Sequence, residues 1–197
     1  MLKVREFNEF QTLKERWNDS LNRSLDNSVF STWEWLSTWW KHFGKGKSLV
    51  ILLIEDKNEI FAIAPFVYSK HSLLGFGNLK KISFVGSPES DYNSFILKEK
   101  KLKSLELFFG YLNSHFDWDY LDLQDIPETA ASADLLRRIK LKKQFKNLKD
   151  RVCKSCPYLP LPDSMDVLMK GLGRSMRRNL RRYLRKLKEK YRVELKK

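Results

Sequence analysis

The sequence predicts an α/β (α+β) fold, in which a mixed sheet is flanked by helices and a basic amphipathic helix follows. Three observations favour this class. Apolar residues recur at helical spacing near the N-terminus, two apolar runs rich in β-branched residues then follow one another across a short turn, and helices alternate with strands further on. With 197 residues, 42% of them hydrophobic and 31% charged, the chain has the composition of a folded globular protein.

Two helices are predicted before the first strand. Residues 7–25 carry apolar side chains every three or four positions, so one face of this helix is apolar. The second helix begins at a cap formed by Ser31 or Thr32, is dense in tryptophan, and ends at Gly44.

Four strands are predicted next. Residues 48–55 and 60–70 form a hairpin around a polar turn, and residues 80–86 and 93–98 follow as further strands. Between the last two lies the polar loop GSPESDY, which is rich in turn-forming residues. Because binding residues often sit on loops at strand ends, this loop is a candidate site.

The second half of the chain is predicted to alternate between helix and strand. A helix covers residues 103–116, a half-buried strand covers 118–126, a helix covers 132–143, and a strand covers 145–156. A connector rich in proline then leads to a short helix capped by Asp163 or Ser164, and to the basic helix. We therefore expect a first lobe over 1–160 and a helical segment over 161–197.

Positive charge is concentrated in the last predicted helix. The formal net charge is +14, and residues 168–197 hold 13 of the 38 Lys and Arg but only two of the 24 Asp and Glu. One stripe of this helix is apolar; it comprises Met176, Leu180, Tyr183, Leu184, Leu187 and Tyr191. We expect the stripe to pack against another surface.

The arginines of this helix are candidate anion-binding residues. They are Arg177, Arg178, Arg181, Arg182 and Arg185. Like charges four residues apart destabilise a helix unless an anion relieves them, and guanidinium groups bind phosphate and carboxylate with paired hydrogen bonds. A nucleic acid, a phosphorylated substrate or cofactor, and an anionic lipid surface all satisfy this requirement.

Several classes of protein fit the sequence poorly. The charged N-terminus does not resemble a signal peptide, and no stretch approaches the roughly 18 apolar residues of a membrane-spanning helix, so we expect a cytoplasmic protein with at most peripheral membrane contact. Cys153 and Cys156 form a lone C-x-x-C without further ligands at zinc spacing. The aspartates of residues 117–125 lack a calcium-loop pattern. The sequence therefore predicts no metal site.

Taken together and in order, five stretches resemble GNAT-related acyltransferases of the CelD and FemAB-like type. These are FSTWEWLSTWWKHFG (30–44), IFAIAPFVYSK (60–70), ISFVGSPESDYNSFIL (82–97), WDYLDLQDIP (118–127) and GRSMRRNLRRYLRKLKEKYRVEL (173–195). The resemblance extends over nearly the whole chain. The glycine-containing loop with which such enzymes bind the CoA pyrophosphate has no match here, because the glycines of GLGRSM do not follow a strand.

The resemblance implies a GNAT-like lobe that acts in acyl transfer. The donor would be acyl-CoA or aminoacyl-tRNA, and the acceptor an amine or hydroxyl of a cell-surface or polysaccharide precursor. It also implies that the chain supplies the first lobe and the start of a second, with a strand beginning near Arg192. We therefore expect the chain not to be catalytically complete alone and to pair with a second lobe or a second copy.

The candidate substrate-binding residues are Ser90, Asp91, Tyr92 and Trp33. Asp91 has the chemistry of a general base and Tyr92 that of a proton donor, and the resemblance places their loop at the acceptor cleft. The alternative is a turn-capping aspartate beside a packed tyrosine. Trp33 could stack on a sugar, although aromatic residues at helical spacing usually belong to a core. An alternative function is a non-catalytic module that binds nucleic acid or an anionic surface through the basic helix.

Overall fold

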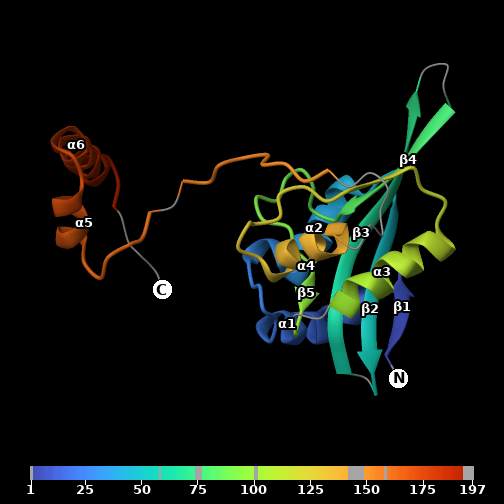
Figure 1. Cartoon of the computed structure of the whole chain (residues 1–197). Helices are drawn as coiled ribbons and strands as arrows, with labels where there is room; N and C mark the ends of the chain where they lie inside the picture. The colour runs from blue at the N-terminus through green and yellow to red at the C-terminus, as the bar shows by residue number, and fades with distance from the viewer. Residues whose placement is uncertain are drawn as a thin grey trace. The chain divides into compact units, whose positions relative to one another are not determined.

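The chain folds into two compact units, Met1–Lys154 and Ser155–Lys197 (Figure 1). The computed structural model describes residues 2–57, 59–73, 77–99, 102–141, 149–157 and 159–192. We refer to the two units as the N-terminal unit and the C-terminal unit.

The N-terminal unit is built on a mixed sheet, as the sequence predicts. Its strands in the described residues are β1 (Lys3–Phe7), β2 (Ser48–Asp56), β3 (Glu59–Leu73), β4 (Gly77–Phe84), β5 (Ile96–Leu97) and β6 (Tyr120–Asp122). They lie in the order β1-β2-β3-β4-β6, and β5 pairs with β3. The pair β4 and β6 is parallel, and the other pairs are antiparallel.

Helices cover both faces of this sheet. The helices α1 (Lys14–Asn22) and α2 (Trp33–Phe43) pack on one face. The helices α3 (Leu102–His115) and α4 (Ala131–Leu141) pack on the other. The unit is therefore a three-layer arrangement with the sheet in the middle (Figure 1).

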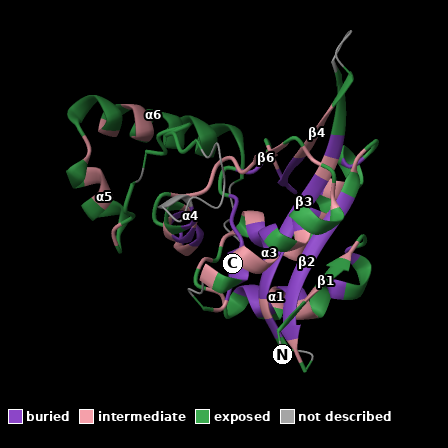
Figure 2. Cartoon of the chain, turned by 45° about the vertical axis from the view of Figure 1, so that its right-hand side comes forward, coloured by how far each residue is buried: buried purple, intermediate pink, exposed green. Residues whose placement is uncertain are grey.

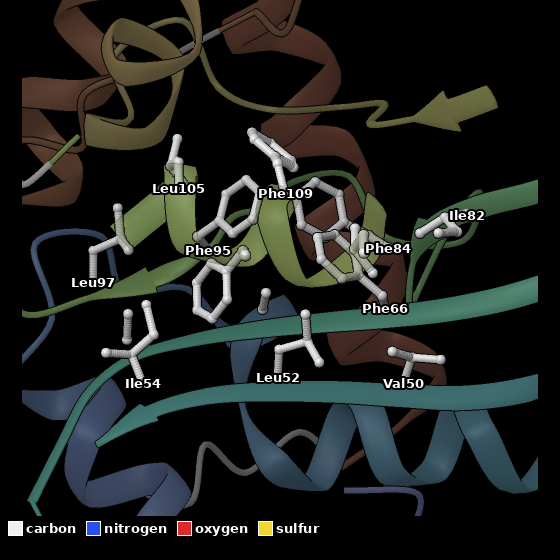
Figure 3. Close-up of a cluster of buried hydrophobic side chains, with 14 of the residues drawn as sticks. Val50, Leu52, Ile54, Phe66, Ile82, Phe84, Phe95, Leu97, Leu105 and Phe109 are labelled. Carbon is white, nitrogen blue, oxygen red and sulfur yellow. The ribbon is translucent and has the colours of Figure 1, made fainter. Parts of the chain in front are cut away.

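The two hydrophobic cores follow from the alternation of side chains along β2. Val50, Leu52 and Ile54 point towards α3, where Figure 3 shows them beneath Phe95 and the residues of that helix. Ile51 and Leu53 point to the opposite face and pack with α1 and α2. Because both faces are covered, the strand is apolar throughout, and this explains the unbroken apolar run in the sequence.

The predicted second helix is confirmed and the first is shorter than expected. The side chain of Thr32 accepts a hydrogen bond from the backbone N–H of Trp35 and caps α2, which ends before Gly44. Only residues 14–22 of the predicted range 7–25 form the α-helix, preceded by a 3₁₀ turn, η1 (Gln11–Leu13). The chain before it forms the edge strand β1, which was not predicted.

Three other predicted elements differ from the structure. No strand forms in residues 149–156, so that part of the predicted strand 145–156 is wrong, and its remainder lies outside the described residues. The predicted strand 93–98 is reduced to the two residues of β5. The predicted strand 118–126 is reduced to the three residues of β6. The two shortened strands pair with a neighbour only over these few residues, β5 with β3 and β6 with β4.

The C-terminal unit contains two helices, α5 (Met165–Gly171) and α6 (Arg174–Lys190), as predicted. Ser164 caps α5, because its side chain accepts a hydrogen bond from the backbone N–H of Val167. No residue of this unit is buried within 155–157 and 159–192, and α6 carries no buried residue in Figure 2. The strand predicted to begin near Arg192 falls mainly on residues 193–197, outside the described part.

In the part of the chain that the structure describes, no helix is both long enough and apolar enough to cross a membrane.

Candidate functional site

The carboxyl ends of β4 and β6 meet at one edge of the sheet, because these strands are parallel. The loop GSPESDY follows β4, and residues 123–126 follow β6. Asn93 joins the two segments: its backbone N–H donates to the carbonyl of Asp125 at 2.9 Å, and its side-chain amide donates to the carbonyl of Gln124 at 3.3 Å. The edge outside the carboxyl ends of parallel strands is a frequent ligand-binding position.

Gly86 shapes the start of this loop. Its φ of +102° is one that residues with a side chain rarely adopt. The carbonyl of Gly86 accepts a hydrogen bond from the backbone N–H of Ser90 at 2.8 Å, and a Cβ at Gly86 would overlap the Ser90 hydroxyl. The position therefore requires glycine.

Two tryptophans of α2 hold the loop. The indole N–H of Trp35 donates to the hydroxyl of Ser90 at 2.8 Å, and that of Trp39 donates to the carboxylate of Glu89 at 2.6 Å. Ser90 is completely buried, so its hydroxyl fixes the loop to the helix. We did not predict this role from the sequence, although a tryptophan packed in a core usually needs an acceptor for its indole N–H.

Asp91 and Tyr92 lie on the outer side of the loop and are exposed. The ring of Tyr92 packs edge-on against Phe30, with ring centroids 5.8 Å apart, and Phe30 in turn packs edge-on against Trp35 at 5.0 Å. The carboxylate of Asp91 forms no hydrogen bond or ion pair with any described residue. The loop thus presents an accessible carboxylate beside partly exposed aromatic rings.

Trp33 lies apart from the loop residues. Its indole N–H donates to the carbonyl of Phe10 at 2.7 Å, and the ammonium of Lys14 lies 5.0 Å from its ring centroid. Residues two apart on a helix point about 200° from each other, so Trp33 faces η1 and α1 whereas Trp35 faces the loop. The structure therefore groups Ser90, Asp91 and Tyr92 with Trp35 rather than with Trp33.

The predicted anion-binding arginines lie on α6 in the C-terminal unit. Arg177 is half-buried, and the other four are exposed. Arg185 forms an ion pair with Glu189 at 3.7 Å, and Arg182 donates to the hydroxyl of Tyr183 at 3.2 Å. Arg177, Arg178 and Arg181 form no ion pair with a carboxylate of the described chain, so their charges are open to an external anion.

The apolar stripe of α6 is also uncovered. It comprises Met176, Leu180, Tyr183, Leu184, Leu187 and Tyr191. Leu184 is 44% exposed and Leu187 is 43% exposed. Leu180 is half-buried, and with its neighbours it lines a shallow apolar hollow that also includes Tyr191. The expected partner surface for the stripe is not supplied within the described C-terminal unit.

The acidic residues near β6 are engaged with lysines. Asp117 forms an ion pair with Lys80, and Asp122 forms one with Lys81 at 2.6 Å. Cys153 and Cys156 are free and exposed. Among the residues that the structure places, no group of three or more His, Cys, Asp or Glu is arranged to hold a metal ion.

Comparison with known protein families gives no match for this chain, and comparison with curated proteins gives none either.

Proposed function

We propose that residues 1–160 form the N-terminal lobe of a GNAT-like acyltransferase that works in the cytoplasm and is not catalytically complete alone. The donor would be acyl-CoA or aminoacyl-tRNA, and the acceptor an amine or hydroxyl of a cell-surface or polysaccharide precursor. The mixed sheet covered by helices on both faces supports the resemblance. The observation that carries the proposal is the fixed loop after β4, which holds Asp91 exposed at the carboxyl ends of the parallel pair.

The loop residues would have separate roles in acyl transfer. The carboxylate of Asp91 would accept the proton of the attacking amine or hydroxyl, and the hydroxyl of Tyr92 would donate a proton to the leaving group. Ser90 would position both, because its hydroxyl ties the loop to Trp35. The arginines of α6 would bind the phosphates of the donor.

Donor binding and acyl transfer test this proposal. Calorimetry should detect acetyl-CoA or aminoacyl-tRNA binding to this chain or to a longer natural form that contains it. In the form that is active, Asp91→Asn should abolish acyl transfer while leaving donor binding unchanged. Asp163→Asn, a substitution of another exposed aspartate, is the matched control and should leave transfer intact. Binding of neither donor by either form would refute the proposal.

We also propose a second candidate function, a non-catalytic module that binds nucleic acid or an anionic surface. It is favoured by the exposed cationic face of α6, where Arg185 is the one arginine that forms an ion pair with a carboxylate among the described residues. If the partner is RNA, the logarithm of the affinity should fall linearly with the logarithm of the salt concentration. Replacing Arg178, Arg181, Arg182 and Arg185 with glutamine should remove the binding.

A further inference from the structure

We propose that α6 lies in the plane of an anionic lipid surface, with its apolar stripe inserted between the headgroups and its arginines on the lipid phosphates. The inference rests on the second candidate function and identifies the anionic partner. Two features of the helix carry it: the uncovered apolar stripe, and the position of the charges around that stripe.

The apolar stripe is narrow and continuous. At 3.6 residues per turn its six members fall within an arc of about 100° around the helix. The helix has 17 residues and is about 26 Å long at a rise of 1.5 Å per residue, and the stripe, from Met176 to Tyr191, covers about 23 Å along its axis. An arc of apolar side chains opposite a strongly charged face is characteristic of helices that lie at a membrane interface.

The charges on either side of the stripe are placed to reach lipid phosphates. Arg177, Arg181 and Lys188 follow one edge of the apolar arc, and Lys186 and Lys190 lie towards the other. Their long side chains can extend from the edge of the stripe to the headgroups while their methylene groups stay among apolar atoms. Arg178 and Arg182 lie on the opposite side of the helix, farther from such a surface.

The stripe distinguishes a lipid surface from a nucleic acid. Phosphate contacts alone would satisfy the arginines but would leave Leu180, Leu184 and Leu187 in water. An anionic bilayer accommodates the charged and the apolar parts of the helix together. No residue in the described part of the C-terminal unit is buried, so this part does not form a core around the stripe.

Vesicle sedimentation with the full chain tests the inference. The chain should bind vesicles of phosphatidylcholine mixed with phosphatidylglycerol, and should bind pure phosphatidylcholine vesicles much more weakly. Leu184→Gln with Leu187→Gln should abolish binding without any change in charge. Circular dichroism of each variant should show that the N-terminal unit remains folded.

A charge-matched pair of double variants gives the sharper comparison. Arg177→Gln with Arg181→Gln removes two charges beside the stripe, and Arg178→Gln with Arg182→Gln removes two charges opposite it. The first pair should weaken vesicle binding by about tenfold or more, since each basic residue near an anionic surface contributes about 1 kcal/mol, or fivefold. The second pair should weaken vesicle binding much less.

Each alternative gives a different result. Equal losses from the two arginine pairs, with no effect of the leucine substitutions, would mean attraction without insertion and would overturn the inference. RNA binding without vesicle binding would overturn it but retain the second candidate function. If the chain binds neither RNA nor vesicles, both the inference and the second candidate function are refuted. A stable dimer in solution that the leucine substitutions dissociate would assign the stripe to a second copy and overturn the inference as well.

Discussion

Glu55 is a buried carboxylate of the N-terminal unit that pairs with two arginines. It is 7% exposed, and its two oxygens accept hydrogen bonds at 2.7 Å from the guanidinium groups of Arg5 and Arg16. Burial opposes its negative charge, but the hydrogen bonds from Arg16 and Arg5 outweigh burial and hold the pKa of Glu55 below its ordinary value. The residue thereby connects strand β1, strand β2 and helix α1.

The lowered pKa of Glu55 predicts a stability that depends on pH. The stabilisation is fully present above the unfolded-state pKa of a glutamate, about 4.3, and is lost as pH falls through the lower folded-state pKa. Glu55→Gln should therefore reduce the free energy of unfolding at neutral pH by about 1–2 kcal/mol, a modest value because both arginines are partly exposed. The difference from wild type should narrow in acid.

Urea unfolding at neutral and acidic pH measures this effect. Glu15→Gln is the control, because Glu15 is an exposed carboxylate on α1 without an ion pair to the described residues. A deficit for Glu55→Gln that stays constant across the pH range would contradict the assignment.

Substitution by alanine should have opposite effects on stability at two glycines. Gly86→Ala should destabilise the N-terminal unit by about 1–3 kcal/mol, because alanine disfavours the positive φ and its Cβ would overlap the buried Ser90 hydroxyl. Gly110→Ala should stabilise it by about 0.5–1 kcal/mol, since Gly110 is an exposed interior position of α3 where a Cβ meets no atom within 4 Å. Thermal unfolding of both variants would show the contrast, and a shift in the same direction would refute it.

At the scale of elements, α2 connects the core to the candidate site. Leu36 and Trp39 are buried against the sheet, while Trp35 and Trp39 donate hydrogen bonds to the loop after β4. The position of the loop therefore depends on how firmly α2 is formed. A weaker helix should disturb the loop as well as the core.

The cap of α2 provides a test of that dependence. Thr32→Ala removes the side-chain oxygen that accepts from the backbone N–H of Trp35 and should cost about 1 kcal/mol of stability. Hydrogen exchange should quicken both at the start of α2 and in the loop after β4. Thr12→Ala is the control, because Thr12 is exposed and its side chain forms no hydrogen bond in the described chain. Faster exchange confined to α2 would show that the loop is held independently.

The elements that the sequence predicts well are those whose signal is local. The hairpin of β2 and β3 has long apolar runs, and α2 has a cap, helical spacing and a terminal glycine. The strand β1 has no such signal, because Lys3–Phe7 carries charged residues at an edge and is defined by pairing with β2. The candidate site is likewise predictable only where its signal is local. Turn residues locate the loop, but the burial of Ser90 depends on Trp35, which lies 55 positions away.

At the scale of the whole molecule, the two units differ in what stabilises them. The N-terminal unit has two hydrophobic cores, one on each face of its sheet. The C-terminal unit has no buried residue in its described part, and a single helix of 17 residues is only marginally stable in water without packing. The C-terminal unit should therefore open far more often than the N-terminal unit.

Limited digestion with trypsin should expose this difference. Cleavage should occur rapidly at the arginines of α6 and leave a resistant product that ends near Lys154, because cleavage follows the fraction of time a segment is open. The product should retain the thermal unfolding midpoint of the full chain, since both cores lie within it. Anionic vesicles should slow the cuts in α6 and leave cleavage near Lys154 unchanged, if the helix lies on lipid as inferred. Cleavage of α6 that is as slow as cleavage within the sheet, in the absence of vesicles, would mean that another surface of the protein covers the apolar stripe.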